Sequence, residues 1–174
     1  MKLMTLAIFL GAYVPTHASI AATLSQFVLI EGRGPGEIYN LYLNSETHSA
    51  ITGKPANIEA RVGGKFEAFK GIPDDNTYGL TGRFLAFDNN TRGKNEYNLV
   101  QTWRGHHDLP DEADSTLSLT FREFKLGERR GTEIELVQSN VPDRLRAAVD
   151  SGWNEHYWNP LRKYLADHPA AERK

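Results

Sequence analysis

The stretch "SGWNEHYWNPLRKYL", residues 151–165, gathers four large aromatic side chains near the end of a chain of 174 residues. Its large apolar residues recur every three or four positions, which is the spacing of one face of an α-helix. The charged residues fall mostly on the other side, so the pattern predicts an amphipathic helix whose aromatic face needs a cover. The residues expected on that face are Trp153, Tyr157, Leu161 and Tyr164.

Proline interrupts this helical pattern at position 160. A proline inside a helix removes an amide donor and clashes with the preceding turn. Two outcomes remain open: a kink at Pro160, or a second helical segment that Asn159 caps and Pro160 begins.

Three segments before this helix alternate apolar and polar residues with a period of two. The alternation is clearest in residues 115–124 and recurs in 97–105 and 132–139, which predicts antiparallel strands with one covered face and one wet face. The covered face would lie against the aromatic face of the helix. The residues expected on it are Leu99, Gln101, Trp103, Leu117, Leu119, Phe121, Ile134, Leu136 and Gln138.

The amino-terminal half contributes a first strand, two short helices and further short strands. Residues 24–32 are rich in apolar and β-branched side chains and end in a glycine-rich turn, which predicts a strand. Residues 37–53 show helical spacing, with Ser45 and Thr47 as expected caps and Gly53 as the stop. The whole predicts an α+β fold, in which a curved antiparallel sheet of about six strands wraps around a long C-terminal helix.

Composition narrows the classes of function. The chain is long enough for one domain with its own core. A net charge of -2 argues against a nucleic-acid binder, which normally carries a basic stripe. The absence of cysteine excludes a disulfide, a thiol nucleophile and a thiolate metal site.

The chain begins with the layout of a secretory signal. "MKLMTLAIFLGAYVPTHASIAA" has one lysine, an apolar run from Leu3 to Val14, and small residues where cleavage would occur. The apolar run is shorter than the roughly 20 residues that span a membrane. We therefore expect a signal over residues 1–21 and no membrane span. The protein is expected to be secreted or periplasmic if the signal is used, and cytoplasmic otherwise.

Five motifs together resemble a known family. They are "ITGKPANIEARVGGKFEAFKG" (51–71), "LVQTWRG" (99–105), "STLSLTF" (115–121), "GTEIELVQSNVP" (131–142) and "GWNEHYWNPLRKYL" (152–165). Their order and spacing are similar to those of the activator of Hsp-90 ATPase homologue proteins, in the SRPBCC superfamily of START-like, Bet v-type domains. The resemblance covers residues 25–168 and leaves residues 169–174 as a polar tail. It implies the helix-grip fold, with a cavity between sheet and helix.

A cavity of this kind makes ligand binding the first hypothesis. Gln101 stands on an otherwise apolar face, where a buried polar group is costly without a partner. A small apolar or aromatic molecule, or a buried water, would supply one. Trp158 is expected at the edge of the cavity, about 100° around the helix from Tyr157. The expected lining is Gln101, Trp103, Leu117, Leu119, Ile134, Leu136, Trp153 and Tyr157.

Two other functions stay open. The resemblance implies a protein-interaction module, related to the Hsp-90 activators, that uses the outer face of the sheet. It also allows a cyclase or hydrolase with His156 or Tyr157 as acid or base, although we expect no catalysis and no cofactor. His106, His107 and Asp108 are adjacent in a polar loop, and adjacent side chains of an extended chain diverge, so no metal site is expected.

The expected signal generates a prediction about processing. Protein purified from its own source should begin between Ser19 and Thr23, because the small residues before these positions fit the cleavage pattern. Mass spectrometry of the intact chain measures this directly. A mature protein that retains Met1 would show that the segment is not removed.

Overall fold

The computed structural model describes residues 21–89 and 95–169. The predicted signal, residues 1–21, lies outside this part except for its last residue. The predicted tail, residues 169–174, lies outside it except for its first.

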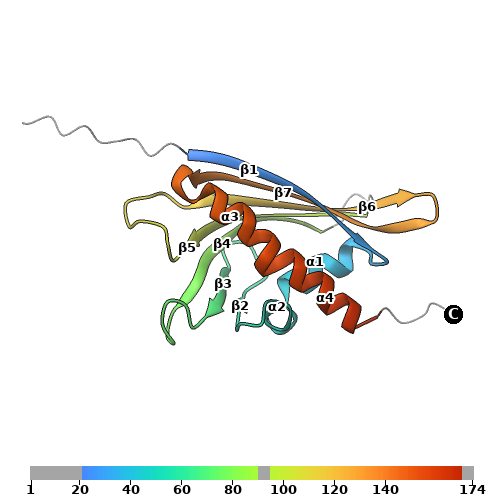
Figure 1. Cartoon of the computed structure of the whole chain (residues 1–174), viewed down its shortest axis with the longest axis horizontal. Helices are drawn as coiled ribbons and strands as arrows, with labels where there is room; N and C mark the ends of the chain where they lie inside the picture. The colour runs from blue at the N-terminus through green and yellow to red at the C-terminus, as the bar shows by residue number, and fades with distance from the viewer. Residues whose placement is uncertain (1–20, 90–94, 170–174) are drawn as a thin grey trace, which may run out of the picture.

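The described chain forms one antiparallel sheet of seven strands (Figure 1). The order across the sheet is β1-β7-β6-β5-β4-β3-β2, so the first and last strands are neighbours. About six strands were predicted, and the additional one is a two-residue strand too short to show any periodicity. The strands are β1 (Ala21–Glu31), β2 (Asn57–Ile58), β3 (Lys65–Lys70), β4 (Tyr78–Asn89), β5 (Glu96–Gly105), β6 (Ser115–Leu126) and β7 (Arg129–Pro142).

Two short helices follow the first strand, as predicted. They are α1 (Pro35–Leu43) and α2 (Ser45–Thr52). The cap of α2 is Asn44, whose side-chain oxygen accepts a hydrogen bond from the Thr47 amide at 3.0 Å, rather than the expected Ser45 or Thr47. Gly53 ends α2 at a φ of 71°, a left-handed conformation that glycine adopts without strain.

The C-terminal helix crosses the inner face of the sheet as one continuous rod (Figure 1). After a short 3-10 turn, η1 (Asp143–Leu145), it runs through α3 (Arg146–Trp153), the π-helical turn η2 (Asn154–Trp158) and α4 (Asn159–Asp167). The Asn159 amide donates to the Asn154 carbonyl, five residues back. Asn159 therefore does not cap a separate segment, and the helix accommodates Pro160 by widening the turn that precedes it.

The predicted inner face is confirmed residue by residue. In the middle of the sheet Leu99 pairs with Leu119, and Leu119 pairs with Leu136, so three leucines from three strands form one row. All nine residues expected on this face are buried. Their neighbours in sequence on the other face, such as Ser118 and Thr120, remain partly accessible.

None of the helices in residues 21–89 and 95–169 combines the length and apolar character that crossing a membrane requires.

The confirmed register generates a prediction about stability. Leu119→Lys should lower the free energy of unfolding by at least about 3 kcal/mol, because it places an unpaired charge in the core. Thr120→Lys, one residue later, should change it by less than about 0.5 kcal/mol, because its side chain faces Glu135 on the outer face. Chemical denaturation of both variants tests this, and equal losses would contradict the register.

Candidate functional site

Two glutamines of the sheet hold the C-terminal helix by its tryptophans. The Trp158 indole N–H donates to Gln26 Oε1 at 2.7 Å, and the Trp153 indole N–H donates to Gln138 Oε1 at 2.9 Å. Gln26 also donates from Nε2 to the backbone carbonyl and the carboxylate of Asp150. These contacts fix both the rotation of the helix and its position along the sheet.

The π-helical turn explains why both tryptophans reach the sheet. A turn closed by a hydrogen bond to the fifth residue back brings positions five apart onto one side of the helix. Trp153 and Trp158 consequently stack, with ring centroids 5.4 Å apart and planes at 18°. Trp158, expected at the cavity's edge, is buried, and the π-helical turn brings it closer to the Trp153 side of the helix than a regular period of 3.6 residues would.

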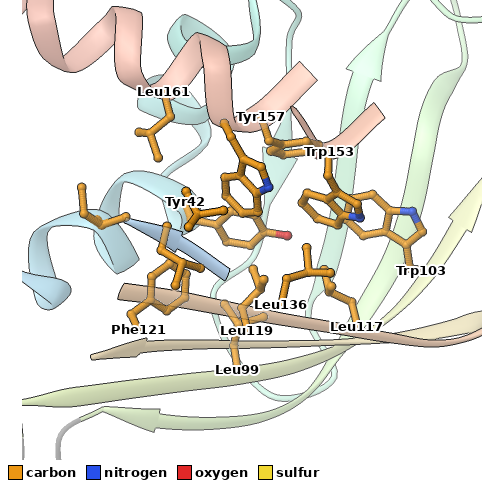
Figure 2. Packing of buried hydrophobic residues seen from close by; sticks show 14 of the residues in the cluster. Tyr42, Leu99, Trp103, Leu117, Leu119, Phe121, Leu136, Trp153, Tyr157 and Leu161 are labelled. Atoms are coloured by element: carbon orange, nitrogen blue, oxygen red, sulfur yellow. The ribbon is translucent and has the colours of Figure 1, made fainter. Parts of the chain in front are cut away.

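Aromatic rings fill most of the space between helix and sheet. Trp153 contacts Tyr157 at 4.6 Å and Trp103 at 4.8 Å between ring centroids, and Phe66 stacks on Trp103 at 5.7 Å. Figure 2 shows Trp153, Tyr157 and Leu161 approaching the sheet leucines from the helix, with Trp103 beside Trp153. This part of the interior is a packed core.

Four buried polar side chains meet on one side of this core, and we call them the polar cluster: Tyr42, His48, Gln101 and Tyr157. They come from α1, α2, β5 and η2. The His48 ring lies 5.2 Å from Tyr42 and 5.6 Å from Tyr157 between centroids. The Tyr42 hydroxyl donates a long hydrogen bond, 3.4 Å, to Gln101 Oε1. The helices, the sheet and the C-terminal helix thus each contribute to one small polar region.

Within the described residues, three atoms of the polar cluster have no hydrogen-bond partner. They are His48 Nε2, Gln101 Nε2 and the Tyr157 hydroxyl. His48 Nδ1 lies 2.9 Å from the Tyr42 carbonyl, an acceptor, so Nδ1 carries the proton and Nε2 is left as an acceptor. Burial lowers the pKa of His48 to about 4 and keeps the ring neutral at neutral pH. Burial also raises the pKa of the Tyr42 and Tyr157 hydroxyls well above the ordinary value.

A void of about 20 Å³ borders the polar cluster. It lies between α1 and α2 on one side and the C-terminal helix on the other. Its volume matches one water molecule rather than an organic ligand. The residues around it are Ile38, Leu41, Tyr42, His48, Ile51, Thr52, Phe121, Ile134, Tyr157, Trp158 and Leu161.

The structure brings all eight predicted lining residues into the interior but only two of them to the void. Ile134 and Tyr157 border it. Gln101 belongs to the polar cluster, without bordering the void. The other five, which pack within the filled core, are Trp103, Leu117, Leu119, Leu136 and Trp153. Contact of any of the eight with a ligand stays a prediction.

The sequence analysis identified neither His48 nor Tyr42 as a site residue. His48 lies three residues before Ile51, so helical spacing already places it on the apolar side of α2. A histidine in that position needs hydrogen-bond partners. The meeting of Tyr42 with Gln101, 59 positions away in the chain, has no local signal.

The residues considered for acid–base or metal chemistry lie on the C-terminal helix and in a surface loop. His156 is exposed on the helix and contacts the ring of Phe69, whereas the Tyr157 ring lies 5.6 Å from the His48 ring between centroids. His106 and His107 lie in a surface loop, and no group of three metal-ligating side chains occurs within residues 21–89 and 95–169. Arg104 organises that loop through Asp114 and the carbonyls of Leu109 and Glu112.

Comparison with known proteins agrees with this architecture. Residues 34–166 match the family described as "Activator of Hsp90 ATPase homolog 1-like protein". This chain belongs to that family. The human activator of 90 kDa heat shock protein ATPase homolog 1 is 28% identical over 129 residues, which cover 74% of this chain and 33% of the human protein. The chain therefore spans about a third of the length of that relative.

Solved structures support the same fold. An HSP90 activator from Plasmodium falciparum is similar with a TM-score of 0.61 and 19% identity, over 84% of this chain and 96% of that one. A protein from Mesorhizobium loti is similar with a TM-score of 0.62 and 18% identity, over 86% of this chain and all of that one. These likenesses establish the helix-grip fold of the family member described here.

The buried histidine generates a prediction about pH. The unfolded chain binds a proton at His48 below about pH 6.5, whereas the folded chain resists it down to about pH 4. The stability from this group is complete above pH 6.5 and should fall by about 3 kcal/mol between pH 6.5 and 4. His48→Phe should flatten that part of the profile in urea unfolding. The same replacement at exposed His156 is the control, and similar profiles for parent and His48→Phe would contradict the assignment.

Proposed function

We propose that this protein binds a small, mostly apolar molecule bearing a hydroxyl group, with the hydroxyl held by the polar cluster. One observation carries the proposal: three buried polar atoms of the polar cluster, from three elements, have no hydrogen-bond partner among the described residues. Burying an unsatisfied group costs about 1–3 kcal/mol each. A fold that keeps three such groups together is readily explained if a bound molecule supplies their partners.

The identity of the three atoms selects the ligand's polar group. His48 Nε2 needs a donor, and Gln101 Nε2 needs an acceptor. A hydroxyl donates one hydrogen bond and accepts two, so one group would donate to His48 Nε2 and accept from both Gln101 Nε2 and the Tyr157 hydroxyl. The rest of the ligand would meet Ile38, Ile51 and Leu161, which border the void.

The size of the void sets a condition on binding. Sites for small organic molecules commonly measure about 300–1,000 Å³, whereas this void measures about 20 Å³. A ligand larger than water must separate α2 from α4, since Ile51 and Thr52 of α2 and Leu161 of α4 close the void. The structure described here would then be the closed form, and the pair α1–α2 would be the part that moves.

The filled core favours a second candidate, a protein-interaction module. If the interior admits no ligand, the function lies on the surface, as expected of a domain related to activators of the heat shock protein ATPase. The location decides which partners are accessible. Should the amino-terminal segment act as a secretory signal, we propose that either function is performed outside the cytoplasm.

A matched pair of probes tests ligand binding. We expect the protein to bind 2-naphthol about tenfold more tightly than naphthalene, because one satisfied hydrogen bond contributes about 1.4 kcal/mol. Tyr157→Phe should remove much of this preference. It should also raise the free energy of unfolding of the ligand-free protein by about 1 kcal/mol, because it deletes an unsatisfied buried hydroxyl. Fluorescence titration and urea unfolding measure the two effects on the same variant.

Tyr164→Phe is the control, because Tyr164 is on the same helix but stacks on His168 away from the void. It should change neither measurement. Failure of the parent protein to bind either probe would favour the interaction module. A loss of stability in Tyr157→Phe would show that the hydroxyl already has a partner, such as a buried water, and would contradict the proposed role.

A further inference from the structure

The edge strand β1 pairs with β7 on one side and, among the described residues, with no strand on the other. It is 11 residues long, whereas β2 at the other edge has only two. The Gly32 amide donates to the Arg130 carbonyl across the β1–β7 pair at 2.8 Å. Amides alternate in direction along an antiparallel strand. The amides of Leu29 and Phe27, an odd number of residues earlier, therefore face away from β7.

The same residues carry the exposed apolar side chains of this strand. Phe27 is 65% exposed and Leu29 is 47% exposed. Across β7 they lie opposite Glu135 and Glu133, and both glutamates form ion pairs with Arg122. The two exposed apolar side chains of β1 thus lie at the edge, beside a charged patch on the sheet face. This arrangement suits a partner that extends the sheet rather than one that lies on its face.

The stretch 24–30 of β1 also lacks the usual protection of a sheet edge. Natural edges carry charged residues, especially lysine, or proline, which discourage pairing with another chain. Residues 24–30 contain neither a charge nor a proline. The nearest charge is Glu31, which is engaged by Arg129 of the same chain.

We propose that this protein forms a symmetric dimer by antiparallel pairing of β1 with β1 of a second copy. A two-fold axis at Val28 places Phe27 opposite Leu29 of the other copy, twice, and Ser25 opposite Glu31. The outward amides then meet outward carbonyls, and no like charges face each other. A two-fold interface requires this self-complementarity. The proposal is independent of the interior site and of its ligand.

Sedimentation equilibrium of the full chain tests the dimer from micromolar to millimolar concentration. We expect the mass to rise from that of one 19.6-kDa chain towards twice that value. Phe27→Lys should weaken dimerisation at least tenfold, because it places two lysines in the new interface. Leu29→Pro should also weaken dimerisation, because it removes an outward-facing amide that would pair with the second copy. The pairing of β1 with β7 does not depend on that amide.

Leu126→Lys is the matched control, since Leu126 is 67% exposed at the far end of β6. It should dimerise like the parent. Circular dichroism identifies any variant that fails to fold. If Leu29→Pro does not fold, Phe27→Lys alone tests the proposal. A parent that stays monomeric throughout, or a dimer that neither Phe27→Lys nor a folded Leu29→Pro weakens, would overturn the proposal. Equal weakening by Leu126→Lys would overturn it as well.

Discussion

The structure depends on how the C-terminal helix is attached to the sheet. A helix that presents a broad aromatic face can slide or rotate over an apolar surface with little change in buried area, because hydrophobic contact has no direction. Hydrogen bonds do have direction. The pairs Trp158–Gln26 and Trp153–Gln138 join the helix to β1 and β7, the first bond being partly buried and the second fully buried. Breaking either pair would leave a buried polar group unsatisfied.

This attachment bears on which part of the interior would have to open in the proposed binding of a ligand. Gln26 and Gln138 hold the start and middle of the helix against β1 and β7. By contrast, α2 borders the void with His48, Ile51 and Thr52, and the two polar side chains form hydrogen bonds to carbonyls of α1 and α2 rather than to α4. Separating α2 from α4 would therefore break mainly van der Waals contacts, whereas separating the C-terminal helix from β1 or β7 would also break hydrogen bonds. The polar cluster lies where these two regions meet, since Tyr157 belongs to the helix and His48 to α2.

Periodicity predicted the sheet and the helix because burial imposes it along the chain. The alternation of Leu117, Leu119 and Phe121 follows directly from one face being covered. The details that make the candidate site have another origin. Neither the π-helical turn before Pro160 nor the hydrogen bond between Trp158 and Gln26, 132 positions apart, has a local pattern. The strand β2 was not predicted for a related reason, since its two residues cannot display a period of two.

The three inward glutamines show how the same residue type takes different roles. Gln26 and Gln138 each use both ends of the side-chain amide in hydrogen bonds. Gln101 uses only its oxygen, in a long contact with Tyr42. If these glutamines only stabilised the fold, both ends of each side-chain amide would be expected to form hydrogen bonds, because a buried amide group without a partner costs free energy. A leucine at such an apolar position would avoid that cost. The unsatisfied Gln101 belongs to the same polar cluster as the unsatisfied His48 and Tyr157, and the proposed ligand site would explain this coincidence.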